Sequence, residues 1–161
     1  MLSISIDNSI YGAHNLDMGL LQLDLISTPN TTLDRRRDPK IRRQLSEPAM
    51  HAFLRIAETW GLNTEAQRAL LGWPPESTFF KYKAGQVATL PYDMLMRISL
   101  VLGICKALQI LYPEPDLAER WVTLPNSNPL FGGRPALALM TEGGTDGLYQ
   151  VRRLLDSRSG G

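Results

Sequence analysis

The chain has 161 residues, of which 43% are hydrophobic and 20% are charged, and its formal net charge at pH 7 is only +1. Such a chain is long and apolar enough for one compact core with a tail, and because it is nearly neutral, any contact with DNA has to come from a local patch. Its single cysteine, Cys105, excludes an internal disulfide and a thiolate zinc site, and no run approaches the roughly 18 apolar residues of a membrane span.

Residues 1–33 differ in composition from everything after them. They include Asp7, Asp17 and Asp24 but no Lys or Arg, and residues 2–7 alternate apolar and polar side chains as a β-strand does. A lone strand is not stable in water, so this segment is either a disordered arm or an element that pairs with a second copy of the chain. Both interpretations stay open.

The densest positive charge follows at residues 35–43, where six of nine positions are Lys or Arg. Such runs are most often simply solvated, but beside a DNA-binding domain a basic arm commonly contacts phosphates, and both interpretations are kept. We therefore assign residues 1–45 to an N-terminal arm and basic linker, partly disordered or engaged in dimerisation.

From Ser46 onward the apolar residues recur with a helical period. Ser46 and Pro48 provide a cap and an early proline, which predict the start of a helix, and Gly61 predicts its end. Asn63 is placed to cap a second, shorter helix. The buried face of these two helices is predicted to comprise Met50, Phe53, Leu54, Ala57, Trp60, Ala66, Ala69 and Leu70.

A tight corner at residues 72–75 leads into a third helix that runs from Ser77 to Gly85, because two consecutive prolines cannot continue a helix interior. Two short helices joined by a glycine-containing turn fit a helix-turn-helix. Phe79 and Tyr82 are predicted to pack inward. Hydroxyl and ammonium groups suit base edges and phosphates, and an aromatic ring can contact a thymine methyl. A helical bundle without a DNA role is the alternative. The candidate DNA-binding residues are Ser77, Thr78, Phe80, Lys81 and Lys83.

A fourth helix is predicted to start near Pro91 and to run until Pro113, with apolar residues on nearly every side. Such a helix is buried either in the core or against another subunit, and the excess of apolar side chains over one face predicts a homodimer. Cys105 lies in this run and is expected to be a buried structural thiol. The main buried face is predicted to consist of Met94, Leu95, Ile98 and Leu102.

The C-terminal segment is predicted to contain two further helices. Residues 125–129 combine Pro and Asn and predict a stiff elbow, and Pro135 opens a short helix. The glycines at 143–144 then end it by supplying the left-handed residue of a C-cap. Thr145 or Asp146 is expected to cap the final helix.

Arg152 and Arg153 lie on the flanks of the final helix, and the tail at residues 157–161 is basic, small and expected to be flexible. An arginine-bearing tail of this kind can reach into an anionic cleft. An ordinary last helix with a frayed end is the alternative. The buried face of the final helix is predicted to comprise Leu148, Val151 and Leu155.

A series of apolar, proline and glycine positions runs through this segment in a fixed order: Trp121, Pro125, Asn126, residues 130–134, Leu137, Leu139, Met140, Gly143, Gly144, Leu148, Val151, Leu154 and Leu155. The series resembles the C-terminal toxin-binding domain of the Xre-type antitoxins that are paired with RES-domain toxins, the group that includes ParS. The similarity extends more weakly back to about Met50. One departure is visible at residues 135–139, where the family usually has Ser/Thr-Pro-Leu-Glu-Leu and this chain lacks both the cap residue and the Glu.

The resemblance implies an all-α fold in which an Xre-like helix-turn-helix domain, residues 46–112, precedes a small toxin-binding domain, residues 113–161. It implies an antitoxin that neutralises a cognate RES-domain toxin, which consumes NAD or transfers ADP-ribose, by occluding the toxin's NAD-binding active site. It also implies a homodimer that binds operator DNA of its own operon. Guanidinium groups suit acidic or backbone acceptors in such a pocket. The candidate toxin-binding residues are Arg134, Arg152, Arg153, Asp156, Arg158, Gly160 and Gly161.

Motifs of enzyme chemistry are missing from the sequence. There is no Gly-rich phosphate loop, no paired-histidine metal spacing and no nucleophile elbow, and His14 and His51 are poorly placed for catalysis. Because these motifs are missing, we expect a protein without enzyme activity, metal or cofactor. The N-terminus also lacks the pattern of a secretion signal, so we expect the protein to be cytoplasmic. Two rival functions stay open: a helix-turn-helix transcription regulator without a toxin partner, and an adaptor that does not bind DNA.

Overall fold

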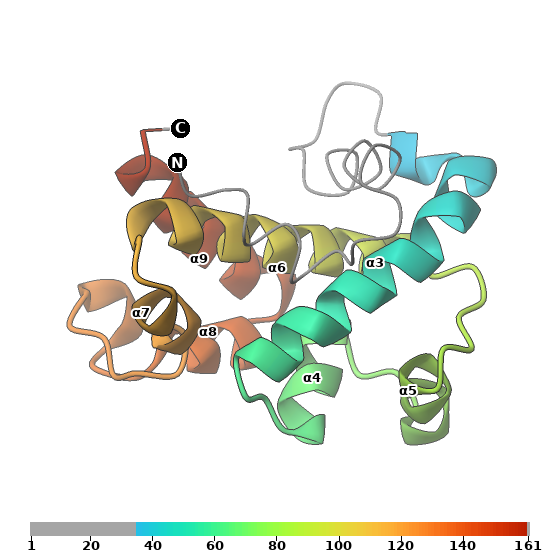
Figure 1. The fold of residues 1–161 in the computed structure, drawn as a ribbon, viewed down its shortest axis with the longest axis horizontal. Helices are drawn as coiled ribbons and strands as arrows, with labels where there is room; N and C mark the ends of the chain where they lie inside the picture. Colours follow the sequence, from blue (N-terminus) through green and yellow to red (C-terminus); the bar gives the residue numbers. More distant parts are fainter. Residues whose placement is uncertain (1–34, 161) are drawn as a thin grey trace.

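Residues 35–160 are described in the computed structural model of the chain, and they form α-helices, two short 3-10 helices and loops, with no β-strand among them (Figure 1). The all-α prediction is confirmed for this part of the chain. The predictions made for residues 1–33 and for Gly161 lie outside it. In chain order the elements are η1 (Arg35–Arg37), α3 (Pro39–Thr59), α4 (Thr64–Leu71), α5 (Glu76–Lys83), α6 (Tyr92–Leu111), α7 (Pro115–Arg120), η2 (Pro129–Phe131), α8 (Ala136–Glu142) and α9 (Gly144–Arg158).

The first long helix, α3, begins at Pro39, and the predicted start at Ser46 is wrong. Asp38 is the N-cap, and its side chain accepts a hydrogen bond of 2.9 Å from the backbone N–H of Lys40. The sequence therefore contains two successive cap-and-proline signals, of which the first starts the helix and the second lies inside it.

Ser46 is buried inside α3 and ties that helix to the loop that precedes α6. Its hydroxyl donates to the Arg42 carbonyl at 2.6 Å and accepts from the backbone N–H of Leu90 at 2.8 Å. The second contact joins residues 44 positions apart, so it cannot be recognised from a local pattern. Pro48 is accommodated in the helix interior, where its nitrogen donates no hydrogen bond.

The basic run at residues 35–43 is folded and is not a linker. η1 covers its first three residues, and α3 includes the remainder from Pro39 onward. Arg36 is only 4% exposed, and the guanidinium carbon of Arg37 lies 5.3 Å from the ring centroid of Tyr92. The backbone of this run is therefore part of the folded structure, and the side chain of Arg36 is buried in it.

α4 and α5 agree with the prediction. Asn63 caps α4 by accepting a hydrogen bond of 2.8 Å from the backbone N–H of Ala66, and Gly72 ends it with a φ of 89°. α5 follows directly after the proline corner. Phe79 and Tyr82 are both buried, as their spacing predicted.

α6 is the central helix, packed against α3, α4, α7 and α9 (Figure 1). Its predicted main face is buried, and it continues to Leu111 as predicted. α6 is long and apolar enough to cross a membrane by length and composition, but 72% of that stretch is buried inside the structure, as in the core helix of a folded domain. Contacts within one chain account for the apolar character from which a homodimer was inferred, and the homodimer stays a prediction.

The junction between α8 and α9 matches the prediction in part. Gly144 has a φ of 60° and supplies the expected left-handed residue. The chain enters α9 at that same residue, with no side-chain cap, so the predicted cap at Thr145 or Asp146 is wrong. Residues 157 and 158 belong to the last turn of α9 and not to a flexible tail, because the backbone hydrogen bonds continue to the N–H of Ser159.

Candidate functional site

The C-terminal segment contains a closed loop between α7 and α8. Trp121 and Phe131 are both buried, and their rings pack edge to face with centroids 5.9 Å apart. The two ends of the loop meet where the backbone N–H of Asn126 donates to the Arg134 carbonyl at 3.3 Å. Aromatic packing and backbone contacts together hold the predicted elbow in place.

α8 begins without a side-chain cap, with Pro135 at the cap position. The backbone N–H of Leu137 instead donates to the carbonyl of Val122 at 2.9 Å, and the N–H of Ala138 donates to the Pro135 carbonyl at 3.0 Å. The Ser or Thr that is missing from the sequence pattern is thus replaced by a tertiary contact with the turn that follows α7.

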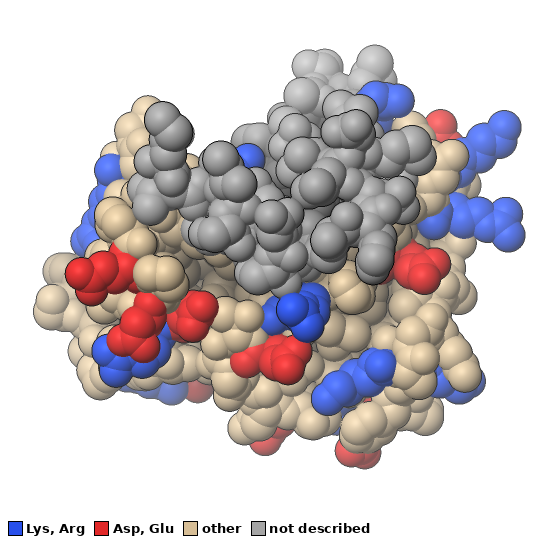
Figure 2. All heavy atoms as spheres, viewed as in Figure 1, with Lys and Arg blue, Asp and Glu red and all other residues tan. Residues whose placement is uncertain are grey.

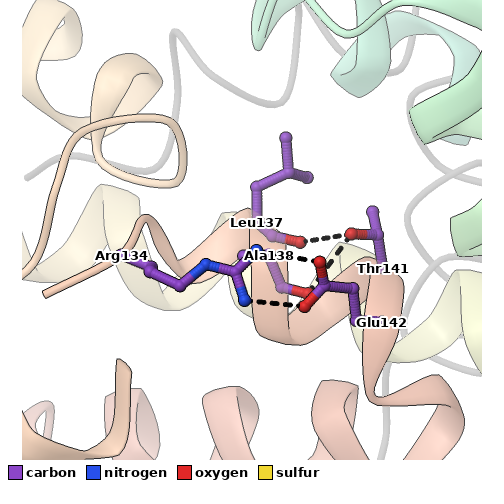
Figure 3. A network of polar contacts seen from close by, with 5 residues as sticks. All are labelled: Arg134, Leu137, Ala138, Thr141 and Glu142. Atoms are coloured by element: carbon purple, nitrogen blue, oxygen red, sulfur yellow. Dashed lines mark hydrogen bonds and ion pairs between the residues drawn. The ribbon is translucent and has the colours of Figure 1, made fainter. Parts of the chain in front are cut away.

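Arg134 and Glu142 form a two-pronged ion pair along one side of α8 (Figure 3). Nη1 and Nη2 of Arg134 each donate to one carboxylate oxygen, at 2.8 Å in both cases. The hydrogen bonds and the charge of Arg134 hold the pKa of Glu142 below its usual value. The pair connects Arg134, which precedes the N-cap residue Pro135, to Glu142, the last residue of α8, and it is exposed to solvent.

α9 is anchored to the core along its whole buried face. Leu148, Val151 and Leu155 are each 0% exposed, and the helix packs against α6 and α8. Arg152 is part of this interface. Its guanidinium lies against Gly103 of α6, and a methyl group on that glycine would overlap it.

The predicted toxin-binding residues of α9 divide into two groups. Arg152 and Asp156 form an ion pair with 3.1 Å between Nε and Oδ2, and their side chains are only 16% and 35% exposed. Arg153 and Arg158 are exposed, and no acidic residue within residues 35–160 forms an ion pair with either. Gly160 is exposed beyond the end of the helix. The charges of the second group are the more exposed, and the roles of both groups in toxin binding stay predictions.

The predicted DNA-binding residues lie along α5, outside its buried face. The ring of Phe80 is 50% exposed and packs edge-on against buried Phe79, with centroids 5.8 Å apart. Nζ of Lys83 lies 5.9 Å from the centroid of the same buried ring. Ser77, Phe80, Lys81 and Lys83 are exposed, and Thr78 is half-buried.

Exposed cations without an acidic partner within residues 35–160 occur in two separate regions. In contrast, Arg97 and Arg120 are each paired with an acid on the same helix, Asp93 and Asp116. Figure 1 places α5 and the C-terminal end of α9 at opposite ends of the molecule, so the two charged regions are available to two different partners. The cations that lack an acidic partner within residues 35–160 include Lys40, Arg43, Lys81 and Lys83 on α3 and α5, and Arg153 and Arg158 on α9.

Two hollows in the surface were not predicted from the sequence. One, of about 380 Å³, lies between α4 and α8 and has Arg134 and Glu142 in its lining. Trp73 also lines it, with 53% of its surface exposed and a φ of 63°. The other, of about 740 Å³, lies between α3 and α5. Each hollow forms where helices from distant parts of the sequence meet, so periodicity carried no signal for it.

The described part of the chain offers no cluster for metal binding, since no three His, Cys, Asp or Glu side chains within residues 35–160 are grouped so as to hold an ion. Cys105 is buried, as predicted. Burial, with a contribution from Glu119, raises the pKa of its thiol to about 12, so the sulfur stays protonated at neutral pH.

The C-terminal part of the chain is similar to a known domain family. Residues 107–161 match the antitoxin Xre/MbcA/ParS C-terminal toxin-binding domain. The chain is 43% identical over 112 residues to the uncharacterized protein y4oB of Sinorhizobium fredii (strain NBRC 101917 / NGR234), in an alignment that covers 70% of this chain and 84% of y4oB. No solved structure matches the chain. The chain therefore belongs to one family with y4oB, and its last third is similar to the antitoxin Xre/MbcA/ParS C-terminal toxin-binding domain.

Proposed function

We propose that the protein neutralises a cognate RES-domain toxin by occluding the NAD-binding active site of that toxin with its C-terminal segment. The observation that carries the proposal is the match of residues 107–161 to a toxin-binding domain. That domain ends in α9, where Arg153 and Arg158 are exposed and have no acidic partner within residues 35–160. Guanidinium groups in this state are free to donate charge-assisted hydrogen bonds to a partner.

The geometry favours occlusion by a rigid helix end. The buried face of α9 packs on α6, and Arg152 is held against Gly103. A helix that is already ordered loses little conformational entropy on binding, which favours affinity. Arg153 and Arg158 then contact acidic or backbone acceptors of the toxin, whereas Arg152 and Asp156 hold α9 in position. Inhibition of this kind requires no catalytic residue in the antitoxin.

The experiment uses the RES-domain protein that the neighbouring reading frame is proposed to encode. Purified toxin is incubated with NAD, and the loss of NAD is followed with and without the full-length chain. The double variant Arg153→Ala/Arg158→Ala is expected to inhibit at least ten-fold less well, since each charge-assisted hydrogen bond is worth roughly 1.5–3 kcal/mol. Arg120→Ala is the matched control, because Arg120 is exposed in the same domain but is paired with Asp116. Full inhibition by the double variant contradicts the proposed role of these arginines, and a neighbouring frame without a RES domain contradicts the RES toxin as partner.

We further propose that α4 and α5 form a helix-turn-helix that binds operator DNA of the same operon, and that the protein does so as a homodimer in the cytoplasm. The exposed hydroxyl, aromatic and lysine side chains of α5 support this proposal, as does the absence of acidic partners for Lys81 and Lys83 within residues 35–160. A gel shift with the upstream DNA tests it. Binding that is sensitive to salt and weakened by Lys81→Ala supports operator binding, whereas no shift by the unmodified protein favours an adaptor without a DNA role.

A further inference from the structure

The hollow between α3 and α5, called the α3–α5 hollow below, has a volume of about 740 Å³ and opens beside the C-terminal end of α5. α3 contributes Arg43 and His51 to its lining, and α5 contributes Tyr82 and Lys83. Arg43, His51 and Lys83 are exposed, whereas Tyr82 forms part of the floor with 9% of its surface exposed. Two helices that are distant in sequence thus bring three basic side chains to one concave site.

The charge of the α3–α5 hollow is not balanced by its own acids. Neither Arg43 nor Lys83 has an acidic partner within residues 35–160, and Glu47 is the single carboxylate among the residues that line the hollow. In contrast, the charge of Arg55, which also lies on α3, is balanced by an ion pair of 3.8 Å with Glu58. Figure 2 shows Lys and Arg side chains projecting from the end of the molecule that carries the start of α3.

We propose that the α3–α5 hollow binds a backbone phosphate of duplex DNA, with Arg43 and Lys83 as its ligands, so that α3 and α5 together form the DNA interface. This inference rests on the proposed operator binding, and it adds α3 to α5 as a helix that contacts the DNA. Phosphate contacts fix the position of a protein on the duplex without reading its sequence, and they require cations beside the helix that enters the groove. The Arg43 guanidinium presents a planar fork that matches two phosphate oxygens, and the Lys83 ammonium supplies a compact charge on the opposite wall.

Two other residues of the α3–α5 hollow, Tyr82 and Glu47, have opposite effects on the binding of a phosphate. Burial raises the pKa of the Tyr82 hydroxyl above its ordinary value, so the hydroxyl remains protonated at neutral pH and is available as a hydrogen-bond donor. The Glu47 carboxylate repels a phosphate. Removal of its charge is therefore expected to strengthen DNA binding, while removal of the charge of Arg43 or Lys83 is expected to weaken it.

Fluorescence anisotropy of the full-length chain tests the proposal with two labelled duplexes, one carrying the DNA upstream of the reading frame and one carrying the same bases in scrambled order. Affinities are measured between roughly 50 and 200 mM salt. Arg43→Ala and Lys83→Ala are each expected to weaken binding to both duplexes about five-fold and to lower the salt slope by about one. Glu47→Gln is expected to tighten binding to both duplexes. Arg55→Ala, on the same helix but outside the hollow, is the control.

The outcomes separate this inference from operator binding itself. If Lys81→Ala weakens binding while Arg43→Ala and Lys83→Ala leave the affinity and the salt slope unchanged, operator binding stands and the phosphate site in the α3–α5 hollow is refuted. If the unmodified chain binds neither duplex at the lowest salt, both proposals fail. Equal or tighter binding of a single-stranded RNA of the same length also refutes the site as one for duplex DNA. Thermal unfolding of each variant verifies that its fold is retained.

Discussion

The guanidinium of Arg152 lies against Gly103, at a point where α6 has no side chain and where even a methyl group would overlap it. The glycine leaves room for this guanidinium between α6 and α9, and Asp156 of α9 forms an ion pair with the same arginine. The position of the Arg152 guanidinium therefore depends on a residue about fifty positions earlier in the chain.

Gly103→Ala is expected to change the stability by no more than about 1 kcal/mol, because the methyl group displaces only the far end of the flexible Arg152 side chain and alanine is favoured over glycine in a helix interior by about 1 kcal/mol. The measurement is the free energy of unfolding in urea. Arg152→Ala removes the overlapping group, so the double variant Gly103→Ala/Arg152→Ala is expected to lose less than the sum of the two single effects. Strictly additive effects would show that the two residues do not interact.

Ser46→Ala is expected to cost about 1–3 kcal/mol of unfolding free energy, because it leaves the buried backbone N–H of Leu90 without its acceptor. Chemical unfolding of the variant measures the loss. Thr59→Ala provides the comparison, since Thr59 is exposed at the end of the same helix and its substitution is expected to change stability by no more than about 0.5 kcal/mol. A Ser46 variant as stable as the Thr59 variant contradicts the tertiary role of the hydroxyl.

The Arg134–Glu142 pair gives a dependence of stability on pH whose sign follows from the lowered pKa of Glu142. A carboxyl group with a lower pKa in the folded state contributes stability above its unfolded pKa and loses that contribution as the pH falls through its folded pKa. The pair is exposed, so the contribution is small and screened by salt. Thermal unfolding is expected to show a difference between the unmodified chain and Arg134→Ala at pH 7 and low salt, and none in strong acid. A difference that persists in acid has another origin.

Local signals in the sequence predicted the elements whose boundaries depend on neighbouring residues. Asn63 caps α4 and Gly72 ends it, and the spacing of Phe79 and Tyr82 identified the buried face of α5. The predicted start of α3 was wrong because two equivalent cap signals compete, one at Asp38 and one at Ser46. Neither signal indicates that the Ser46 hydroxyl accepts a buried hydrogen bond from Leu90. For the candidate site, the sequence placed Arg152 and Arg153 on the flanks of the final helix but could not show that only Arg153 is exposed, since a helix flank looks the same whether it faces solvent or a glycine on another helix. The roles of these arginines in toxin binding stay predictions.

The remaining prediction concerns the thiol of Cys105, which is 5% exposed in the middle of α6. Burial raises its pKa to about 12, and because the thiolate is the reactive form, the folded protein is expected to react very slowly with a thiol reagent such as Ellman's reagent at pH 8. In denaturing urea the same thiol is expected to react within the time of mixing. The rate in urea divided by the rate in the folded protein then reports how rarely the core around α6 opens. This ratio should fall when Leu155→Ala removes a buried side chain of α9. Rapid reaction of the unmodified folded chain would contradict the burial of this thiol and, with it, the packing of α6 as the central helix.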